Sequence, residues 1–378
     1  MRNIFFYLDY INLFITILLI LRLVMPLKVA LSLKLALILI VPVYTSRGFL
    51  HHVLGTRIFD LGLNRYLTIL LTGLMTAALL CFLYVLLRDV LMILIKVICR
   101  SLSAASFLSG SLKLNLGVLL FFTVISVYAA SNAFTHPVLV SLDIPMKNLP
   151  KEADGYRIAF LSDTHINYMT RKEEIAAYVD EINKQQPDLI VITGDFQDGT
   201  VDNIGAKVAE LFKLKATDGI YGCEGNHEIY WNYQAWSEFL RSGGIRLLDN
   251  ETVVIRSDNG RELFYLGGIL DNADAEVTCS AFEGFGSDIP KILMSHRPGN
   301  ADYADGKADL VLSGHTHGGM APLVRNVVAM ANHGYVSGLY ILDKGTRLLV
   351  SNGTSMWQGF AFRLYDEAQN YILTLKAE

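Results

Sequence analysis

Long apolar stretches dominate the first third of the chain, and this pattern ends near Ser131. Four stretches before that residue contain few charged side chains; they are Ile4–Leu23, Leu27–Tyr44, Tyr66–Leu87 and Leu116–Ala130. A helix of about 20 apolar residues is long enough to cross a bilayer. The pattern therefore predicts an N-terminal α-helical transmembrane bundle of about four spans over residues 1–131.

The four stretches differ in how well they match an uncharged membrane span of about 20 residues. Tyr66–Leu87 carries no charged residue, whereas Leu27–Tyr44 contains Lys28 and Lys34 and could instead be a short helix whose lysine side chains reach one membrane interface. The segment Asp89–Cys99, with Lys96, is too short to span unless it extends the preceding helix, and of the two possibilities we expect an interfacial amphipathic helix. Lysines and arginines flank the spans on both sides, so they do not settle the topology.

Short apolar runs alternate with amphipathic segments from residue 132 to residue 378. Strand patterns occur at Ile158–Leu161, Leu189–Thr193, Val253–Arg256, Leu263–Leu266, Ile292–Met294, Leu310–Leu312 and Leu348–Ser351, and helical patterns at Arg171–Lys184 and Ile204–Leu214. The segment His136–Pro145 alternates apolar and polar positions and contains two prolines, which favours an edge strand. These elements predict one α/β domain over residues 132–378.

Polar side chains that can bind metal ions follow several of the predicted strands. They form the clusters Asp163-Thr-His165, Gly194-Asp195, Gly225-Asn226-His227-Glu228, His296 and Gly314-His315-Thr-His317. Ligands in open α/β sheets bind at the carboxyl ends of the strands, so we expect these clusters to converge at one edge. A pair of divalent ions needs about six to eight oxygen and nitrogen ligands. The chain supplies Asp163, His165, Asp195, Asn226, His296, His315 and His317.

These motifs resemble those of the calcineurin-like metallophosphoesterase superfamily, from about Tyr156 to the end of the chain. The run Ser313–Gly319, with Gly338–Tyr340 and Val350–Gly353 after it, is similar to a membrane-linked branch that includes the bacterial YkuE and YaeI phosphoesterases. The resemblance implies two packed mixed β-sheets flanked by helices. Glutamine often follows the last glycine of the motif in that branch, whereas this chain has Met320, a departure that concerns substrate contacts rather than metal ligation.

The resemblance also implies roles for individual residues. One ion would be held by Asp163, His165, Asp195 and His317, and the other by Asp195, Asn226, His296 and His315, so that Asp195 bridges them. His227 would face phosphorus as an acid or electrostatic stabiliser, with Glu228 orienting its imidazole, and the catalytic residues would be His227, Asn226 and Asp195. The implied reaction is attack on phosphorus by a metal-bridging hydroxide. The mixed ligand set suits Mn, Fe or Zn.

Composition supports the membrane prediction and argues against one class of partner. Hydrophobic residues make up 52% of the chain and charged residues 18%, against about 45–50% and about 25% in soluble domains. The net charge is −4 and no basic stripe is visible, so we expect no nucleic-acid partner. The expected partners are the lipid bilayer and a phosphoester substrate. The expected location is a bacterial inner membrane, as a multi-pass integral protein.

The substrate follows less directly from the sequence. A catalytic domain held at a membrane meets lipid-linked phosphoesters at high effective concentration. We therefore expect hydrolysis of a phosphodiester or pyrophosphate bond in a lipid-linked substrate such as UDP-2,3-diacylglucosamine. The alternatives are a broad-specificity membrane-anchored phosphatase or phosphodiesterase acting on soluble or headgroup phosphoesters, and a non-enzymatic metal-domain scaffold.

Overall fold

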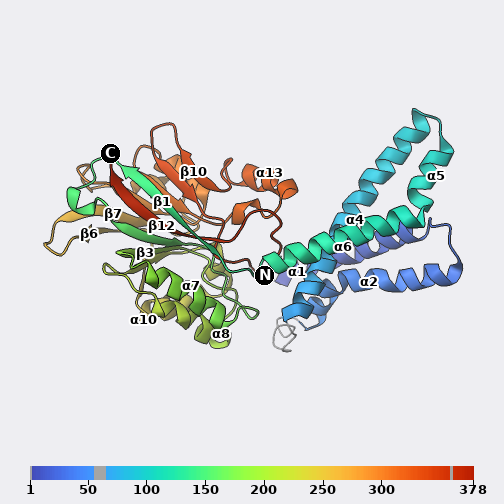
Figure 1. The fold of residues 1–378 in the computed structure, drawn as a ribbon, viewed down its shortest axis with the longest axis horizontal. Helices are drawn as coiled ribbons and strands as arrows, with labels where there is room; N and C mark the ends of the chain where they lie inside the picture. The colour runs from blue at the N-terminus through green and yellow to red at the C-terminus, as the bar shows by residue number, and fades with distance from the viewer. Residues whose placement is uncertain (1, 55–64, 358–360) are drawn as a thin grey trace. The chain divides into compact units, whose positions relative to one another are not determined.

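The computed structural model describes residues 2–54, 65–357 and 361–378. The chain forms two compact units, Met1–Asn132 and Ala133–Glu378, of which the first is helical and the second carries the β-sheets (Figure 1). The described helices of the first unit are α1 (Arg2–Leu19), the π-helical turn η1 (Ile20–Val24), α2 (Leu31–Leu54), α4 (Arg65–Val97), α5 (Leu102–Gly110) and α6 (Leu112–Asn132).

Close packing joins α4 to α6 within the helical unit. A Cβ atom on Gly73 of α4 would lie 2.7 Å from the Cα atom of Val127 on α6, so glycine is required where the two backbones approach. Small residues at such crossings are typical of helix pairs in membranes, where close van der Waals contact drives association. Ala78 and Cys81 of α4 are buried in the same bundle.

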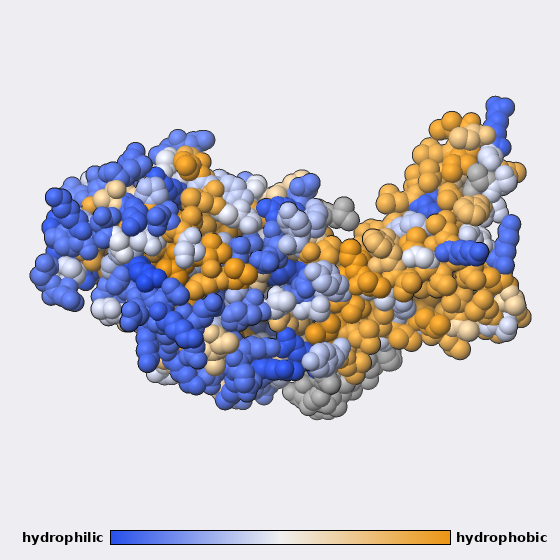
Figure 2. Space-filling model, in the orientation of Figure 1, coloured by the Kyte–Doolittle hydropathy of each residue, from blue (hydrophilic) through white to orange (hydrophobic). Residues whose placement is uncertain are grey.

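Two of the described helices are long and apolar enough to cross a membrane. They are α4, with a mean hydropathy of 2.4 over its best window, and α6, with 1.9. A third apolar helical segment, Tyr10–Val24, is shorter. Hydrophobic side chains cover most of the visible surface of this unit (Figure 2). Within the part of the chain that the structure describes, two spans are therefore supported, and the count of four remains a prediction.

Helix α4 continues without a break beyond Asp89 to Val97, so the expected interfacial helix over Asp89–Cys99 was wrong and the alternative, an extension of the preceding helix, is what the structure shows. The charged residues at that point are neutralised inside the bundle. Buried Arg88 donates hydrogen bonds to Asp89 Oδ1 (2.9 Å), to Asn115 Oδ1 (3.3 Å) and to the Arg22 carbonyl (2.7 Å). Because these contacts satisfy the charges, the helix can carry them without ending.

The second unit contains two mixed β-sheets, as the family resemblance implied. The first sheet has the order β1 (Val138–Met146), β12 (Gln369–Ala377), β2 (Arg157–Leu161), β3 (Leu189–Thr193), β4 (Ile220–Cys223) and β5 (Ile245–Leu247). The second has the order β10 (Gly338–Ile341), β11 (Arg347–Val350), β9 (Leu310–Ser313), β8 (Lys291–Met294), β7 (Glu262–Gly268) and β6 (Glu251–Arg256). The inner strands β2–β3–β4 and β7–β8–β9 are parallel.

Strand β1 lies at the edge of its sheet, which confirms the edge strand predicted near His136–Pro145. It pairs in parallel with β12, from Val138 opposite Gln369 to Met146 opposite Ala377. Pro145 cannot donate to a ladder, and an edge position leaves its nitrogen side without a neighbouring strand.

The main core is formed by side chains of both sheets. It includes Phe160 of β2, Val191 of β3, Ile292 of β8 and Leu312 of β9. Because successive residues of a strand point to opposite faces, the alternate residues of β2 and β3 form a second core. That core includes α7 (Lys172–Lys184), α8 (Val201–Val208) and α10 (Tyr233–Ser242), which cover the outer face of the first sheet (Figure 1). The predicted helix Ile204–Leu214 is in fact α8 followed by a 3₁₀ segment, Ala209–Lys213.

Candidate metal centre

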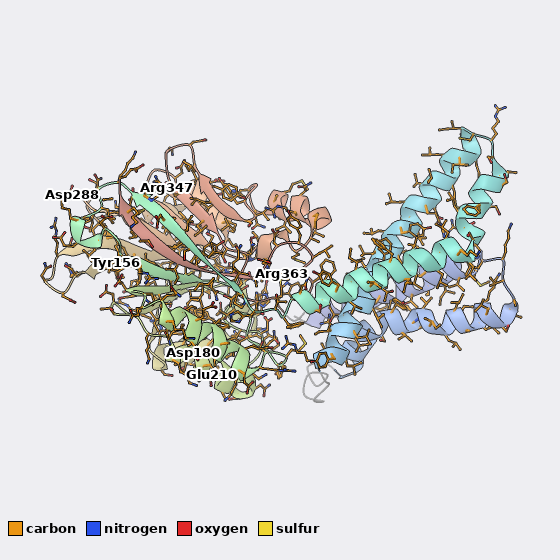
Figure 3. All side chains as sticks on the ribbon, viewed as in Figure 1. Tyr156, Asp180, Glu210, Asp288, Arg347 and Arg363 are labelled. Carbon is orange, nitrogen blue, oxygen red and sulfur yellow. The ribbon has the colours of Figure 1, made fainter. Side chains whose placement is uncertain are left out.

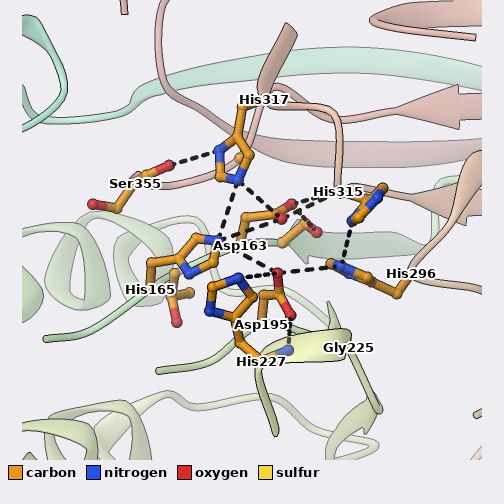
Figure 4. A network of polar contacts seen from close by, with 12 residues as sticks. Asp163, His165, Asp195, Gly225, His227, His296, His315, His317 and Ser355 are labelled. Carbon is orange, nitrogen blue, oxygen red and sulfur yellow. Dashed lines mark hydrogen bonds and ion pairs between the residues drawn. The ribbon is translucent and has the colours of Figure 1, made fainter. Parts of the chain in front are cut away.

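The predicted ligand residues lie directly after the ends of inner strands. Asp163, Asp195, His296 and His315 each stand two residues beyond the last residue of β2, β3, β8 and β9, respectively. Asn226 stands three residues beyond β4 and begins the short helix α9 (Asn226–Tyr230). The carboxyl ends of both groups of parallel strands therefore deliver the polar side chains to one place, where they form a single contact network (Figure 4).

The backbone is strained at five of these residues. The φ angles of Asp163, His165, Asp195, His315 and His317 are 51°, 38°, 53°, 70° and 49°. Side chains other than glycine rarely adopt this left-handed conformation, and such strain tends to cluster at functional sites. All five side chains belong to the contact network at the strand ends (Figure 4).

Two glycines leave the space that the carboxylates need. A Cβ atom on Gly225 would collide with Asp195 Oδ1, and one on Gly314 would collide with the Ser162 hydroxyl and the Asp163 carboxylate. The glycines in these motifs are therefore required by close approach. Substitution at either position would displace a candidate ligand.

One group of candidate ligands consists of Asp163, His165 and His317, all buried. His165 Nε2 lies 3.2 Å from His317 Nε2, which is 3.5 Å from Asp163 Oδ1. His317 Nδ1 donates to the Ser355 carbonyl at 3.1 Å (Figure 4). That bond leaves the Nε2 lone pair of His317 directed at the other two side chains.

The second group consists of Asp195, His296 and His315. His296 Nε2 lies 3.2 Å from Asp195 Oδ2, from His315 Nδ1 and from Asn226 Oδ1. His296 Nδ1 donates to the Thr193 carbonyl at 2.8 Å, so its Nε2 atom faces the group. Burial alone would lower the pKa of His296, but Asp195 outweighs burial and raises it to about 10, so a metal ion at Nε2 would displace a proton.

Asp195 belongs to both groups. Its Oδ2 atom lies 3.4 Å from His165 Nε2 and 3.2 Å from His296 Nε2, while its Oδ1 atom accepts the backbone N–H of His227 at 2.8 Å. One carboxylate oxygen therefore lies between the two sets of imidazoles, in the position that a ligand shared by two ions would occupy.

The donor set fits divalent cations. Burial lowers the pKa of His315 to about 3 and also lowers the pKa of His317, so both rings are neutral and offer lone pairs. Burial raises the pKa of Asp163, because its charge lies away from water. The buried carboxylates and the imidazole nitrogens that face one another bring several electron-pair donors close together. A cation between them would bind these donors.

The sequence interpretation missed Asp198, a buried carboxylate that accepts a hydrogen bond from His227 Nδ1. Burial alone would lower the pKa of His227, but Asp198 and Asp195 outweigh it and raise the pKa to about 9. His227 Nε2 then faces the centre, 3.9 Å from Asp195 Oδ2. The sequence feature that could have identified Asp198 is its position as a second aspartate, three residues after Asp195 in the same loop.

The expectation that Glu228 orients His227 was wrong. The Glu228 carboxylate accepts the backbone N–H groups of Gly225, Asp195 and Phe196, each at 2.8 Å. Glu228 is the third residue of α9 and turns back to cap the start of that helix, as in a capping box. It therefore holds the loops that carry Asn226 and Asp195 instead of contacting the imidazole.

Two arginines beside the centre were also missed. Arg297 makes a bidentate ion pair with Asp271 through Nε and Nη2 (2.8 and 2.9 Å). Its Nη1 atom lies 3.2 Å from His315 Nε2, and Nη2 also lies 3.4 Å from Asn226 Oδ1. Arg363, labelled in Figure 3, is buried and donates to the carbonyls of Asn352 and Ser355 at 2.9 and 3.1 Å. It therefore fixes the carbonyl that orients His317.

Aromatic rings border His227. The ring of Tyr230 lies 5.2 Å and that of Trp357 6.2 Å from the imidazole, measured between centroids. Tyr230 is exposed and Trp357 is partly buried, so they form an apolar rim on the His227 side of the centre.

Comparison with known proteins agrees with this geometry. A family model described as calcineurin-like phosphoesterase matches residues 156–319. A zebrafish (Danio rerio) relative, called transmembrane protein with metallophosphoesterase domain, is 32% identical over 74% of this chain and 67% of its own length. The bovine (Bos taurus) protein of that name is 32% identical over 68% of this chain and 61% of its own length. The uncharacterised metallophosphoesterase YkuE of Bacillus subtilis is 29% identical over 61% of this chain and 82% of its own.

One solved structure illustrates a distant likeness. The NAD nucleotidase of Haemophilus influenzae is 14% identical, with a TM-score of 0.38 over 53% of this chain and 45% of that one.

The two mixed sheets and the clustered carboxylates and imidazoles at their strand ends are features of a metal-dependent phosphoester hydrolase. The chain belongs to the calcineurin-like phosphoesterase family.

Proposed function

We propose that this protein is a membrane-bound hydrolase that uses two divalent metal ions to cleave a phosphodiester or pyrophosphate bond in a lipid-linked substrate. The observation that carries the proposal is the position of Asp195 Oδ2, between the imidazoles of His165 and His296. A shared carboxylate with separate histidine partners on either side is what a two-metal site requires.

The proposed ligands follow the two groups. Asp163, His165, Asp195 and His317 would hold one ion, and Asp195, Asn226, His296 and His315 the other. Carboxylate, amide and imidazole donors suit Mn, Fe or Zn. When bound, two such ions supply Lewis-acid activation of water and neutralise charge on the phosphoryl group.

Protein side chains would supply the remaining catalytic functions. His227, held through Nδ1 by Asp198, directs Nε2 toward the centre and can protonate the leaving oxygen. The Asn226 amide can donate to a phosphoryl oxygen while its Oδ1 faces His296. The proposed catalytic residues are thus His227, Asn226 and Asp195, with Asp198 as a positioning residue.

Arg297 is suited to bind the phosphoryl group. Its bidentate pair with Asp271 fixes the plane of the guanidinium, and one edge remains beside Asn226 and His315. A fixed guanidinium matches the geometry of two phosphoryl oxygens better than an ammonium group does. The side chain is 39% exposed, so an incoming substrate can reach it.

The lipid-linked substrate is supported by the remainder of the chain. Helices α4 and α6 are long enough to span a membrane, and two relatives are named as transmembrane proteins. The rim of Tyr230 and Trp357 offers apolar contact beside the leaving-group acid His227. UDP-2,3-diacylglucosamine is the most concrete candidate. A multi-pass protein of about four spans in a bacterial inner membrane is the proposed setting.

The exposure of Arg297 also favours a second candidate function. A phosphate-binding edge open to solvent would serve a broad-specificity phosphatase or phosphodiesterase that acts on soluble or headgroup phosphoesters. A non-enzymatic scaffold fits less well, because such a protein has no use for an imidazole poised over the centre.

Activity of the detergent-purified full-length protein with Mn²⁺ tests these alternatives. The two substrates are UDP-2,3-diacylglucosamine and bis(p-nitrophenyl) phosphate, and Asp195→Ala is compared with Asp258→Asn, a change of an exposed residue in the turn between β6 and β7. Cleavage of both substrates, lost only in Asp195→Ala, would support the proposal. Cleavage of the diester alone would reject the lipid substrate and favour the broad-specificity enzyme. Cleavage of neither would favour the scaffold.

A further inference from the structure

Helix α13 (Pro322–Ala331) follows the His315-Thr-His317 motif and exposes an apolar face. Val324, Val327 and Met330 are 37%, 58% and 78% exposed. Residues three apart lie on the same side of a helix, so these three side chains form one stripe along it. We refer to Val324, Val327 and Met330 as the outer face of α13.

The charge of α13 is turned away from this face. Its only charged residue is Arg325, which donates to the Gly318 carbonyl at 3.0 Å and to Asp366 Oδ2 at 2.7 Å. Gly319 lies so close beneath the helix that a Cβ atom there would be 2.9 Å from the Arg325 Cα atom. The helix is therefore seated on the loop that follows His317, and its apolar stripe faces outward from a fixed position.

The chain enters the catalytic unit beside the start of α13. Membrane helix α6 ends at Asn132, and the next two residues, Ala133 and Phe134, belong to a small apolar cluster. The other members of that cluster are Met320, Met356, Trp357 and Ala361. Met320 stands two residues before α13, so the first residues of the catalytic unit and the residues that precede α13 pack in one cluster.

We propose that the outer face of α13 lies in the interfacial region of the bilayer, with lipid as its occupant. An uncharged helix face of this kind binds at the level of headgroups and upper acyl chains. Three apolar side chains alone would bind weakly, but covalent attachment to α6 gives the membrane a high effective concentration. Lipid is favoured over a protein partner because the same cluster receives the chain from its own membrane helix.

The inference rests on α6 as a membrane span and is independent of the proposed reaction. It has a consequence for that reaction, because α13 is seated on the loop that carries His317. A bilayer in contact with α13 would bring lipid phosphoesters to the edge of the metal centre.

Site-directed spin labelling of the full-length protein in lipid nanodiscs tests the inference. Labels are placed at Val327→Cys and Met330→Cys, and at Asp258→Cys as a matched exposed control, in a background that carries Cys99→Ser and Cys279→Ser. Cys81 and Cys223 are buried and can stay. The measurement is the collision rate of each label with oxygen, which concentrates in lipid, and with a water-soluble nickel chelate.

We expect the labels at Val327 and Met330 to collide at least threefold more with oxygen, relative to the nickel chelate, than the label at Asp258 does. Equal ratios at the three positions would overturn the inference. Strongly immobilised labels at Val327 and Met330, shielded from both reagents, would show a protein occupant and would overturn it as well. Hydrolysis of bis(p-nitrophenyl) phosphate by the labelled proteins, set beside the unlabelled protein, reports separately whether the catalytic unit is folded and active.

Discussion

His227 Nδ1 donates a hydrogen bond to the buried carboxylate of Asp198, and this bond directs Nε2 of the same ring toward Asp195. The pair joins the loop after β3 to the first turn of α9. A buried carboxylate behind an imidazole fixes both its tautomer and its orientation. This relationship connects the metal ligands to a group that can transfer a proton.

His227→Ala should keep the metal ions but lose turnover. General acid catalysis contributes on the order of 10²–10⁴ in rate, so kcat should fall by about that factor. Metal content measured by mass spectrometry should match that of the wild type, because His227 is not a proposed ligand. A variant that turns over the diester near the wild-type rate would remove His227 from the mechanism.

Asp198→Asn should change the pH profile as well as the rate. In the folded protein the carboxylates raise the pKa of His227 to about 9, so the ring stays protonated up to that pH. Loss of the Asp198 charge lowers this pKa. Because the reaction needs the protonated ring, the decline of activity toward alkaline pH should then begin at a lower pH than in the wild type. The measurement is kcat between pH 6 and pH 10. If kcat of the variant declines at the same alkaline pH as kcat of the wild type, Asp198 does not set the pKa of His227.

Arg297→Ala should weaken substrate binding and transition-state stabilisation together. A hydrogen bond to a charged group contributes about 1.5–3 kcal/mol, so kcat/KM should fall roughly 10- to 100-fold. Arg297→Lys should restore little, because an ammonium group cannot make the bidentate pair with Asp271. Full activity of the lysine variant would show that charge alone matters at this position.

Removal of the metal ions should destabilise the catalytic unit. The buried Asp163 and Asp195 carboxylates and the neutral rings of His315 and His317 would then lose the cations that join them. Ions that bind only the folded state stabilise it by about 2.7 kcal/mol at a free concentration one hundred times Kd. Thermal unfolding followed by tryptophan fluorescence should shift to lower temperature with a chelator and return with Mn²⁺. An unchanged midpoint in both conditions would contradict the metal assignment.

The convergence of the candidate ligands could be predicted from the sequence, because they follow apolar runs whose last residues indicate where the strands end. Asp163, Asp195, His296 and His315 stand at the same offset after apolar runs, and parallel strands deliver equivalent positions to one edge. The two mixed sheets followed from the same runs together with the family resemblance.

Contacts between distant segments could not be predicted in the same way. Glu228 is adjacent to His227 in sequence, yet its carboxylate turns toward backbone groups of another loop, while Asp198, 29 positions away, meets the imidazole. Arg363 reaches the loop of Ser355 only because the chain folds back there. Helix α4 continues past Arg88 because Asn115, on α6, accepts a hydrogen bond from the Arg88 guanidinium. Each of these depends on tertiary packing, which periodicity does not encode.

The number of metal ions bound per chain tests directly whether Asp195 bridges two ions. The full-length protein is reconstituted with Mn²⁺, freed of excess metal and measured by inductively coupled plasma mass spectrometry beside Asp195→Ala and Asp258→Asn. We expect two ions per chain in the wild type and in Asp258→Asn, and fewer in Asp195→Ala, because one carboxylate serves both proposed sites. A single ion in the wild type, or two retained in Asp195→Ala, would contradict a centre bridged by Asp195.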